Sequence, residues 1–246
     1  MTQQSLGIIG AGAFGRFMAQ HLAPFFDVVV YDRHVEAINL SEEKRLKSGD
    51  LQEVASSSIV VIAVPVQRFE DVLHEMAPWV KPGSLILDVA SVKIKTTHLM
   101  QTILPAHVDV VGTHPLFGPQ SGKNGIEGLN IVVANIRGQR EACVATFLEE
   151  KLKLNVFKAT PQEHDKELAY VQGLTHLLAK VVVAMDLPKF RFTTKTYDYM
   201  DQMVEMIRYD SEDLFRAIER ENPFSIEAKK AFFKAARDLE DHLMKD

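Results

Sequence analysis

The 246-residue sequence contains one cysteine, one tryptophan and no excess of basic residues. Cys143 alone can form neither an internal disulfide bond nor a zinc cluster, which favours a reducing, cytoplasmic compartment. It lies in a helix-like run, so we interpret it as a small core residue. The 28 basic residues are outnumbered by 33 acidic ones, for a net charge of −5. This balance lacks the basic patch of a nucleic-acid-binding protein, so we expect no such partner.

Long apolar stretches are also missing. No run approaches the roughly 20 residues that a membrane-spanning helix needs, so we expect no membrane partner. The opening residues, MTQQSLGIIG, lack the basic and apolar regions of a signal peptide. The nine histidines form no H-x-x-x-H or H-E-x-x-H pair, which predicts that there is no metal site. The composition indicates a soluble globular protein.

The first half alternates short β-rich runs with amphipathic helical stretches. Apolar runs predict strands at 5–10, 27–32, 58–64, 84–89, 108–112, 130–134 and 154–158. Apolar residues at helical spacing predict helices at 13–22, 66–80, 94–103 and 138–152. This rhythm is typical of an α/β domain with a mostly parallel, doubly wound sheet.

After Pro161 the pattern becomes helical throughout. The expected helices cover 162–186, 194–208, 211–221 and 223–244. We therefore predict two domains, 1–160 and an all-helical 161–246. The first of these helices has a longer apolar face than so small a domain can hide, which predicts a homodimer formed through the helical domain.

One motif joins the first strand to the first helix. Residues 10–15 fit the pattern G-x-G-x-x-G. The first glycine permits a tight turn, the second lets the backbone approach a pyrophosphate, and the third lets the helix pack on the strand. In this context the motif predicts a Rossmann-type dinucleotide site rather than a glycine turn that binds nothing. Its residues are Gly10, Ala11, Gly12, Ala13, Phe14 and Gly15.

Asp32 ends the second strand, about 20 residues past the motif, where a ribose-binding acid is expected. Its carboxylate favours NAD, because it accepts hydrogen bonds from ribose hydroxyls and repels a 2′-phosphate. Arg33 is either a solvated surface residue or a partner for that phosphate, which keeps NADP as the alternative cofactor.

Ligands of open α/β sheets bind beyond the carboxyl ends of the strands, and three such ends carry chemistry. Val64 and Pro65 follow one strand and are expected to border the nicotinamide. The next two strands lead into D-V-A-S-V-K at 88–93 and T-H-P-L-F-G-P-Q-S-G-K-N-G at 113–125. These segments contain Ser91 and His114.

The two segments resemble the prephenate/arogenate dehydrogenase family, most closely its plant-type branch. The resemblance continues through E-H-D at 163–165, Q-G-L-T-H at 172–176, T-K-x-Y at 194–197 and D-S at 210–211. It thus spans nearly the whole chain. It implies an NAD(P)-dependent oxidoreductase of tyrosine biosynthesis, with a dinucleotide-binding domain at 1–160 and a helical substrate and dimerisation domain at 161–246.

The implied reaction is the oxidative decarboxylation of a cyclohexadienol that carries a ring carboxylate, a 4-hydroxyl and a three-carbon side chain. His114 suits the base that takes the hydroxyl proton, because histidine titrates near neutrality. Ser91 would hydrogen-bond the same hydroxyl. The structural alternatives are a histidine that stabilises its own loop and a serine that caps the helix beginning near Ile94.

The resemblance also implies six substrate-binding residues: Ser121, Gln172, His176, Thr194, Lys195 and Asp210. Gln172 and His176 are spaced i, i+4 and share one helix face. Lys195 would bind a carboxylate, although many bacterial members place an arginine where this chain has Asp198. A lysine gives a point charge rather than a bidentate fork. His164, in E-H-D, we interpret as structural.

Asp210 bears on the choice between arogenate, which carries an α-ammonium, and prephenate, which carries a ketone there. A carboxylate pairs with the ammonium and repels the keto acid, which favours arogenate. The alternative for Asp210 is a helix-capping role, with prephenate as the substrate. The alternatives for the whole chain are a reductase of the β-hydroxyacid or imine class and a non-catalytic NAD-binding regulator. A regulator would need the glycines but not His114, Ser91 and Lys195 together.

Overall fold

The computed structural model describes residues 4–34 and 46–245. Its backbone contacts divide the chain into two compact units, Met1–Pro161 and Gln162–Asp246, which we call the sheet unit and the helical unit. Each unit is described by itself. The assignment of dinucleotide binding to the first, and of substrate binding and dimerisation to the second, stays a prediction.

In the described part of the chain, eight strands form one sheet in the order β3-β2-β1-β4-β5-β6-β7-β8. They are β1 (Ser5–Ile9), β2 (Asp27–Tyr31), β3 (Leu46–Ser48), β4 (Ile59–Ile62), β5 (Leu85–Asp88), β6 (Asp109–Pro115), β7 (Asn130–Arg137) and β8 (Asn155–Lys158). All neighbouring strands are parallel except β6 and β7. The predicted α/β class with a mostly parallel, doubly wound sheet is therefore confirmed.

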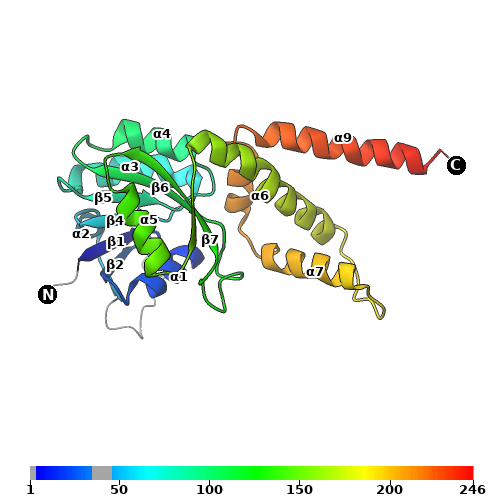
Figure 1. Ribbon diagram of the computed structural model, residues 1–246, viewed down its shortest axis with the longest axis horizontal. Coiled ribbons are helices and arrows are strands. Elements are labelled where there is room, and N and C mark those ends of the chain that lie inside the picture. The colour runs from blue at the N-terminus through cyan, green and yellow to red at the C-terminus, as the bar shows by residue number, and fades with distance from the viewer. Residues whose placement is uncertain (1–3, 35–45, 246) are drawn as a thin grey trace. The chain divides into compact units, whose positions relative to one another are not determined.

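Helices cover both faces of the sheet (Figure 1). One face packs against α1 (Ala13–Leu22) and α5 (Glu141–Glu150). The other packs against α2 (Leu51–Ala55), α3 (Val66–Met76) and α4 (Ile94–Ile103), with a 3₁₀ turn at Ala77–Trp79. Because side chains alternate along a strand, Ile8 contributes to the first core and Ile9 to the second. Both faces are apolar, as expected for a buried parallel sheet.

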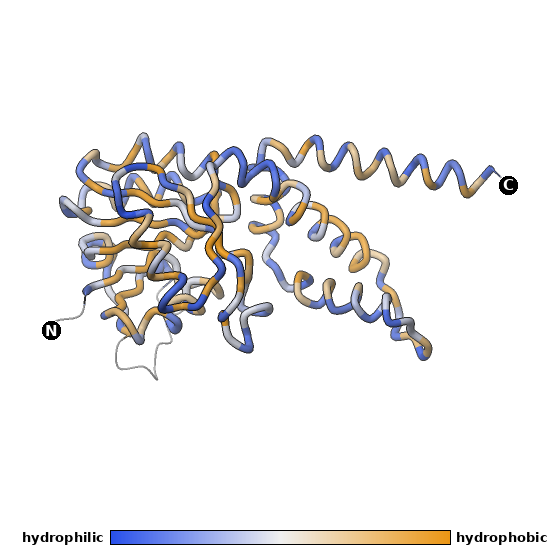
Figure 2. Tube along the Cα trace, in the orientation of Figure 1, coloured by the Kyte–Doolittle hydropathy of each residue, from blue (hydrophilic) through white to orange (hydrophobic). Residues whose placement is uncertain are grey.

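The helical unit contains no strand among its described residues. Its helices are α6 (Pro161–Ala184), α7 (Lys195–Ile207), α8 (Glu212–Arg216) and α9 (Ser225–Leu243), with a π-helical turn η3 (Ala217–Glu221) after α8. Figure 2 shows apolar segments recurring along α6. None of the helices that the structure describes has the length and apolar character needed to span a bilayer.

Several expectations need correction. The short elements β3 and α2 were not predicted, because three and five residues are too few to show a periodicity. The helix expected at 138–152 begins at Glu141, since Gly138 has a φ of +94°. The strand expected at 108–112 continues to Pro115, which places His114 inside β6 rather than in a loop. Cys143 is exposed rather than a core residue.

Candidate active site

The glycine motif forms the turn between β1 and α1. Gly10 has a φ of +111°, and a Cβ there would lie 2.4 Å from the carbonyl oxygen of Ala63. A Cβ on Gly15 would lie 1.9 Å from the carbonyl oxygen of Gly10. Both positions therefore require glycine for conformation or close packing. A Cβ on Gly12 would meet no atom within 4 Å, so Gly12 borders open space.

The amino end of α1 can bind an anion. Gly12 occupies the N-cap position, no side chain caps the helix, and its first turn contains no acidic residue. The first N–H groups of a helix have no partner within the helix, and the helix dipole places a partial positive charge there. The open surface at Gly12 thus adjoins a site that suits a phosphate.

Asp32, directly after β2, is fixed against this turn. Its Oδ2 accepts a hydrogen bond from the backbone N–H of Ala11 at 2.7 Å, and its Oδ1 accepts one from His34 N–H at 2.9 Å. A carboxylate has about four acceptor sites, so Asp32 retains capacity for a ribose. Arg33 is exposed and lies 3.8 Å from Glu75 in a surface ion pair.

Val64 and Pro65 follow β4, beside the same turn. Val64 is half-buried, and its Cγ1 would lie 3.2 Å from a Cβ on Gly10. Pro65 is exposed and occupies the N-cap position of α3. Both residues are thus at the carboxyl edge of the sheet, where we predicted the nicotinamide.

A buried ion pair lies behind the predicted catalytic residues. Lys93 Nζ contacts Asp88 Oδ2, and both side chains are essentially inaccessible. Asp88 Oδ1 also accepts the N–H of Thr113 at 3.3 Å, while the Thr113 hydroxyl donates to the backbone oxygen of Asp88. A Cβ on Gly112 would lie 3.4 Å from Asp88 Oδ1, so β6 passes close to this pair. The pair links the end of β5, the start of α4 and β6.

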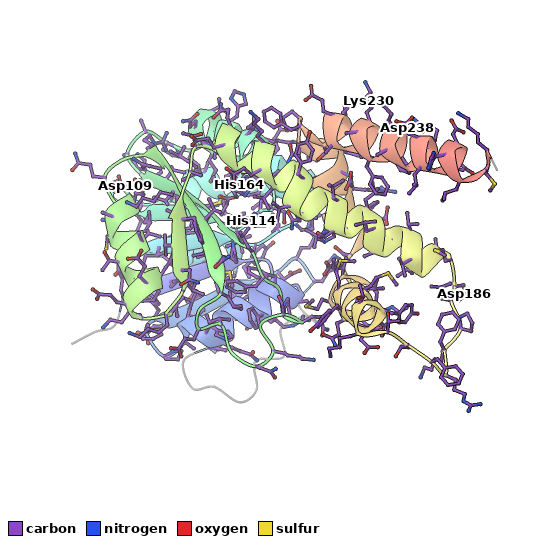
Figure 3. The ribbon with its side chains drawn as sticks, turned by 45° about the vertical axis from the view of Figure 1, so that its right-hand side comes forward. Asp109, His114, His164, Asp186, Lys230 and Asp238 are labelled. Carbon is purple, nitrogen blue, oxygen red and sulfur yellow. The ribbon has the colours of Figure 1, made fainter. Side chains whose placement is uncertain are left out.

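Ser91 and His114 lie at the same edge of the sheet, beyond the end of β5, with His114 still within β6. Asp88 pairs with Gly112 in the parallel ladder of β5 and β6, and both predicted residues follow that pair within three positions. His114 is 2% exposed and lies among the strands (Figure 3). Ser91 is half-buried. The N-cap of α4 is Lys93 and no side chain caps that helix, so Ser91 does not have the capping role that was its structural alternative.

Ser121 stabilises the loop that follows β6. Its Oγ accepts a hydrogen bond from Gly118 N–H at 2.9 Å and donates to Gly118 O at 3.3 Å. The loop packs on α1, because a Cβ on Gly122 would lie 2.7 Å from Phe17. Ser121 is exposed, and its role in substrate binding stays a prediction.

In the helical unit, three predicted residues come together. His176 Nδ1 lies 2.9 Å from the carbonyl oxygen of Gln172, and His176 Nε2 lies 3.1 Å from Asp210 Oδ2. Both ring nitrogens therefore face acceptor oxygens. Both hydrogen bonds form when the ring carries two protons, or when Asp210 is itself protonated. His176 thus orients Asp210, which follows α7 and is part-exposed.

The sequence interpretation did not include Glu219, which lies in the π-helical turn. It is 5% exposed, and its Oε1 would lie 3.7 Å from a Cβ on Gly173 of α6. Burial raises its pKa, and the charges of Lys229 and His176 oppose that rise. Lys229 Nζ lies 3.3 Å from Oε2. π-Turns occur often at functional sites, so this turn is the feature that points to Glu219. The turn is visible in the structure and not in the sequence.

Thr194 and Lys195 lie at the opposite end of α7 from Asp210. The Thr194 hydroxyl accepts the N–H of Tyr197 at 3.2 Å as the helix cap, and Lys195 Nζ lies 4.9 Å from the ring centre of Tyr199. At 1.5 Å per residue, the 13 residues of α7 separate these two sites by about 20 Å. One small substrate cannot contact both ends within one chain.

His164 has the structural setting that E-H-D indicated. Its Nδ1 lies 2.7 Å from Asp165 Oδ1, and both side chains are fully buried. Asn222 Nδ2 donates to the backbone oxygen of Asp165 at 2.7 Å, so the pair connects α6 to the turn before α9. Among the residues that the structure describes, no three histidine, cysteine or acidic side chains cluster as metal ligands. The predicted absence of a metal stays a prediction.

Known proteins match this chain along almost its full length. Residues 18–130 match the family described as prephenate dehydrogenase, nucleotide-binding domain. The chain is 29% identical over 254 residues to arogenate dehydrogenase 1, chloroplastic, of Arabidopsis thaliana, which covers 98% of this chain and 39% of that protein. The chain is thus similar to prephenate and arogenate dehydrogenases. A probable arogenate/prephenate dehydrogenase of Methanocaldococcus jannaschii is 26% identical, over 98% of this chain and 57% of that protein. The chain therefore spans well under two thirds of the length of either relative.

A solved structure has the same fold as this chain. The prephenate dehydrogenase of A. aeolicus, in complex with hydroxyphenyl propionate and NAD+, has a TM-score of 0.78 at 19% identity. The match covers 100% of this chain and 92% of that one. At this identity the likeness concerns the fold alone.

We expect Glu219→Gln to stabilise the protein at neutral pH. Burial raises the folded-state pKa of Glu219 above its unfolded value. The contribution of this side chain to the free energy of unfolding is therefore fully present below the unfolded pKa and is lost as pH rises through the folded pKa. Urea unfolding of the variant and of the wild type, compared between pH 4 and pH 7, measures this. The difference should shrink towards pH 4, where Glu219 is neutral.

The exposed Glu227→Gln on α9 is the matched control and should show no such trend. A Glu219→Gln variant that is less stable than the wild type at pH 7 would mean that the ion pair with Lys229 stabilises the ionised carboxylate by more than its burial destabilises it.

Proposed function

We propose that this chain is an arogenate dehydrogenase that prefers NAD and converts arogenate to tyrosine. One observation carries the proposal: an uncapped helix N-terminus beside Gly12 lies at the same edge of the sheet as the strand ends that carry Ser91 and His114. The helix N-terminus would hold the dinucleotide. Ser91 and His114 would supply a hydroxyl and an imidazole where the nicotinamide would end. The names of the relatives agree with this chemistry.

The residues of the sheet unit fit a nicotinamide dinucleotide. The N–H groups at the start of α1 would hold the pyrophosphate, and Asp32 would accept hydrogen bonds from the adenine ribose. A 2′-phosphate would lie against the Asp32 carboxylate, which supports NAD. Arg33 is already paired with Glu75, but an exposed pair of this kind is weak, so NADP stays the alternative. The bound cofactor supplies the hydride acceptor.

The remaining chemistry falls to side chains of this chain. His114 takes the proton of the 4-hydroxyl while the hydrogen on C4 leaves as hydride. The electron pair of the bond between the ring and its carboxylate then enters the ring as CO₂ departs. His114 returns its proton to the phenolate oxygen, so protons and electrons balance. Ser91, at the same edge of the sheet as His114, would hydrogen-bond the 4-hydroxyl and orient it for proton transfer to His114.

The helical unit would select the substrate. Asp210 Oδ2 is held by His176, which leaves Oδ1 to accept a hydrogen bond from the α-ammonium of arogenate. Prephenate, with a ketone in place of the ammonium, is the second candidate substrate. The geometry that favours arogenate is a part-exposed carboxylate whose orientation is fixed by a neighbouring imidazole.

We further propose a homodimer formed through the helical unit. Most of the exposed large apolar side chains of the described residues lie there, among them Val171, Leu178, Val181 and Phe192. Lys195 lies about 20 Å along α7 from Asp210, too far for both to contact one substrate in one chain. Its proposed carboxylate contact therefore requires a second copy.

Replacing His114 should abolish turnover while the cofactor still binds. His114→Asn keeps the size and polarity of the side chain but removes the base, so kcat should fall by about 10²–10⁴-fold. Initial rates of reduced-cofactor formation measure the loss, and cofactor affinity measured by fluorescence should change little. A matched variant, His107→Asn, alters a histidine that precedes β6 and should retain activity. Near-normal turnover by His114→Asn would refute the base assignment.

Substrate choice should depend on Asp210. The wild type, assayed with arogenate and prephenate and with NAD and NADP, should favour arogenate with NAD. Asp210→Asn should reduce kcat/KM for arogenate by about tenfold or more, since it removes a charge-assisted contact, and should change prephenate much less. An unchanged ratio of the two substrates in Asp210→Asn would show that the ammonium is recognised elsewhere. Turnover of neither substrate by the wild type would instead favour another reductase class or a regulator.

The dimer predicts a sedimentation mass twice that of the 27.7 kDa chain. Val181→Glu, at an exposed apolar position of α6, should shift the equilibrium to monomer because it places a charge in the interface. The exposed Lys166→Glu on the same helix serves as the control for an added negative charge. A wild type that sediments as a monomer at micromolar concentration would contradict the proposal.

A further inference from the structure

An apolar cavity of about 440 Å³ lies in the sheet unit, between α1 and α5. On this face α1 packs on β1 and β2, and α5 packs on β7 and β8. The strands between them, β4, β5 and β6, therefore have no helix directly above them. With neighbouring strands about 4.8 Å apart, this gap is wide enough to leave internal space.

Side chains of the strands form the floor of the cavity and aromatic rings close much of its roof. Val61, Leu87 and Ile131 lie along the floor. Phe26 and Phe147 meet above it with ring centres 5.2 Å apart, and Phe17 and Phe117 lie 6.3 Å apart. The space is thus lined mainly by apolar groups and is partly open to solvent.

The mouth of the cavity, at the amino edge of the parallel strands, is separate from the predicted dinucleotide site. Of the exposed residues that line the cavity, Gln4 and Cys143, near the start of α5, mark this mouth, whereas Lys151 follows α5 at the far end of the cavity. Gln4 precedes β1, at the amino edge of the parallel strands, whereas the glycine turn follows β1 at the carboxyl edge. A ligand entering here would not compete directly with a dinucleotide.

The lining determines the chemistry of the occupant. Cavities of about 300–1,000 Å³ hold small-molecule ligands, and an apolar lining disfavours phosphates and sugars. No acidic residue is among the described residues that line this cavity, and its basic groups are Lys151, at the end opposite the mouth, and His21. His21 Nδ1 donates to Phe17 O at 2.8 Å, which fixes the ring and leaves Nε2 available.

We propose that this cavity binds a small apolar monocarboxylic acid, with its chain or ring inside and its carboxylate against Lys151. Of the residues assigned to cofactor or substrate, the cavity shares only Phe14, in its wall, and the proposal does not rest on the proposed dehydrogenase activity. Its test therefore needs no turnover.

The only cysteine of the chain lies at the mouth and reports occupancy. The full-length protein is alkylated with iodoacetamide, and the rate at Cys143 is followed by intact mass, with octanoate or 1-octanol as the probe. Saturating octanoate should slow the reaction by about tenfold, because thiol reactivity depends on access. The octanol should protect at about threefold higher concentration, since an exposed carboxylate–lysine contact adds little affinity.

Two variants distinguish the cavity from a surface effect. Leu87→Trp fills the floor and should remove protection by both probes. Should that variant fail to fold, Lys151→Gln, an exposed change, should remove the preference for octanoate over octanol, whereas Lys81→Gln, an exposed lysine outside the cavity, should retain it. Absence of saturable protection in the wild type overturns the site. A preference for octanoate that survives Lys151→Gln overturns the assignment of the carboxylate to Lys151.

Discussion

The buried pair of Asp88 and Lys93 holds in place the part of the sheet on which the proposed chemistry depends. Removing one partner of such a pair leaves an unpaired buried charge, at a cost of about 3–5 kcal/mol, so the end of β5 and the start of α4 cannot move apart independently. Asp88 also binds the backbone and hydroxyl of Thr113, the neighbour of His114. Ser91 is one of the four residues between Asp88 and Lys93. One ion pair thus fixes the positions of both predicted catalytic residues.

The two units position polar groups by different means. In the sheet unit, parallel strands bring their carboxyl ends to one edge, so residues far apart in sequence become neighbours without contacting one another. In the helical unit, neighbouring side chains are fixed by direct contacts: His176 with Asp210, and Lys229 with Glu219. Each change in the helical cluster therefore alters the charge that its neighbours experience, whereas the strand ends around Asp88 depend on the buried pair.

Elements long enough to show a repeating apolar pattern were predictable from the sequence, whereas isolated polar contacts were not. The strands and the glycine turn follow from local pattern, which gave the sheet and the expected position of the dinucleotide. The pairing of Asp88 with Lys93 crosses a loop, where no periodicity relates the two residues, although both lay in a segment already identified. Glu219 was missed because a π-turn and burial have no sequence signal of their own. The separation of Lys195 from Asp210 could be inferred from the sequence, because it predicts one helix over 194–208, where α7 lies.

The contact between His176 and Asp210 limits how strongly the proposed site can discriminate between arogenate and prephenate. An ammonium that approaches Asp210 finds Oδ2 already bound by an imidazole, so it gains one oxygen rather than a free carboxylate. Where the imidazole carries two protons, its charge also offsets part of the attraction. Glu219 acts in the opposite direction when ionised, because it adds negative charge near the same ring. A tenfold preference corresponds to only about 1.4 kcal/mol, so the balance among these three groups is sufficient to set which substrate is favoured.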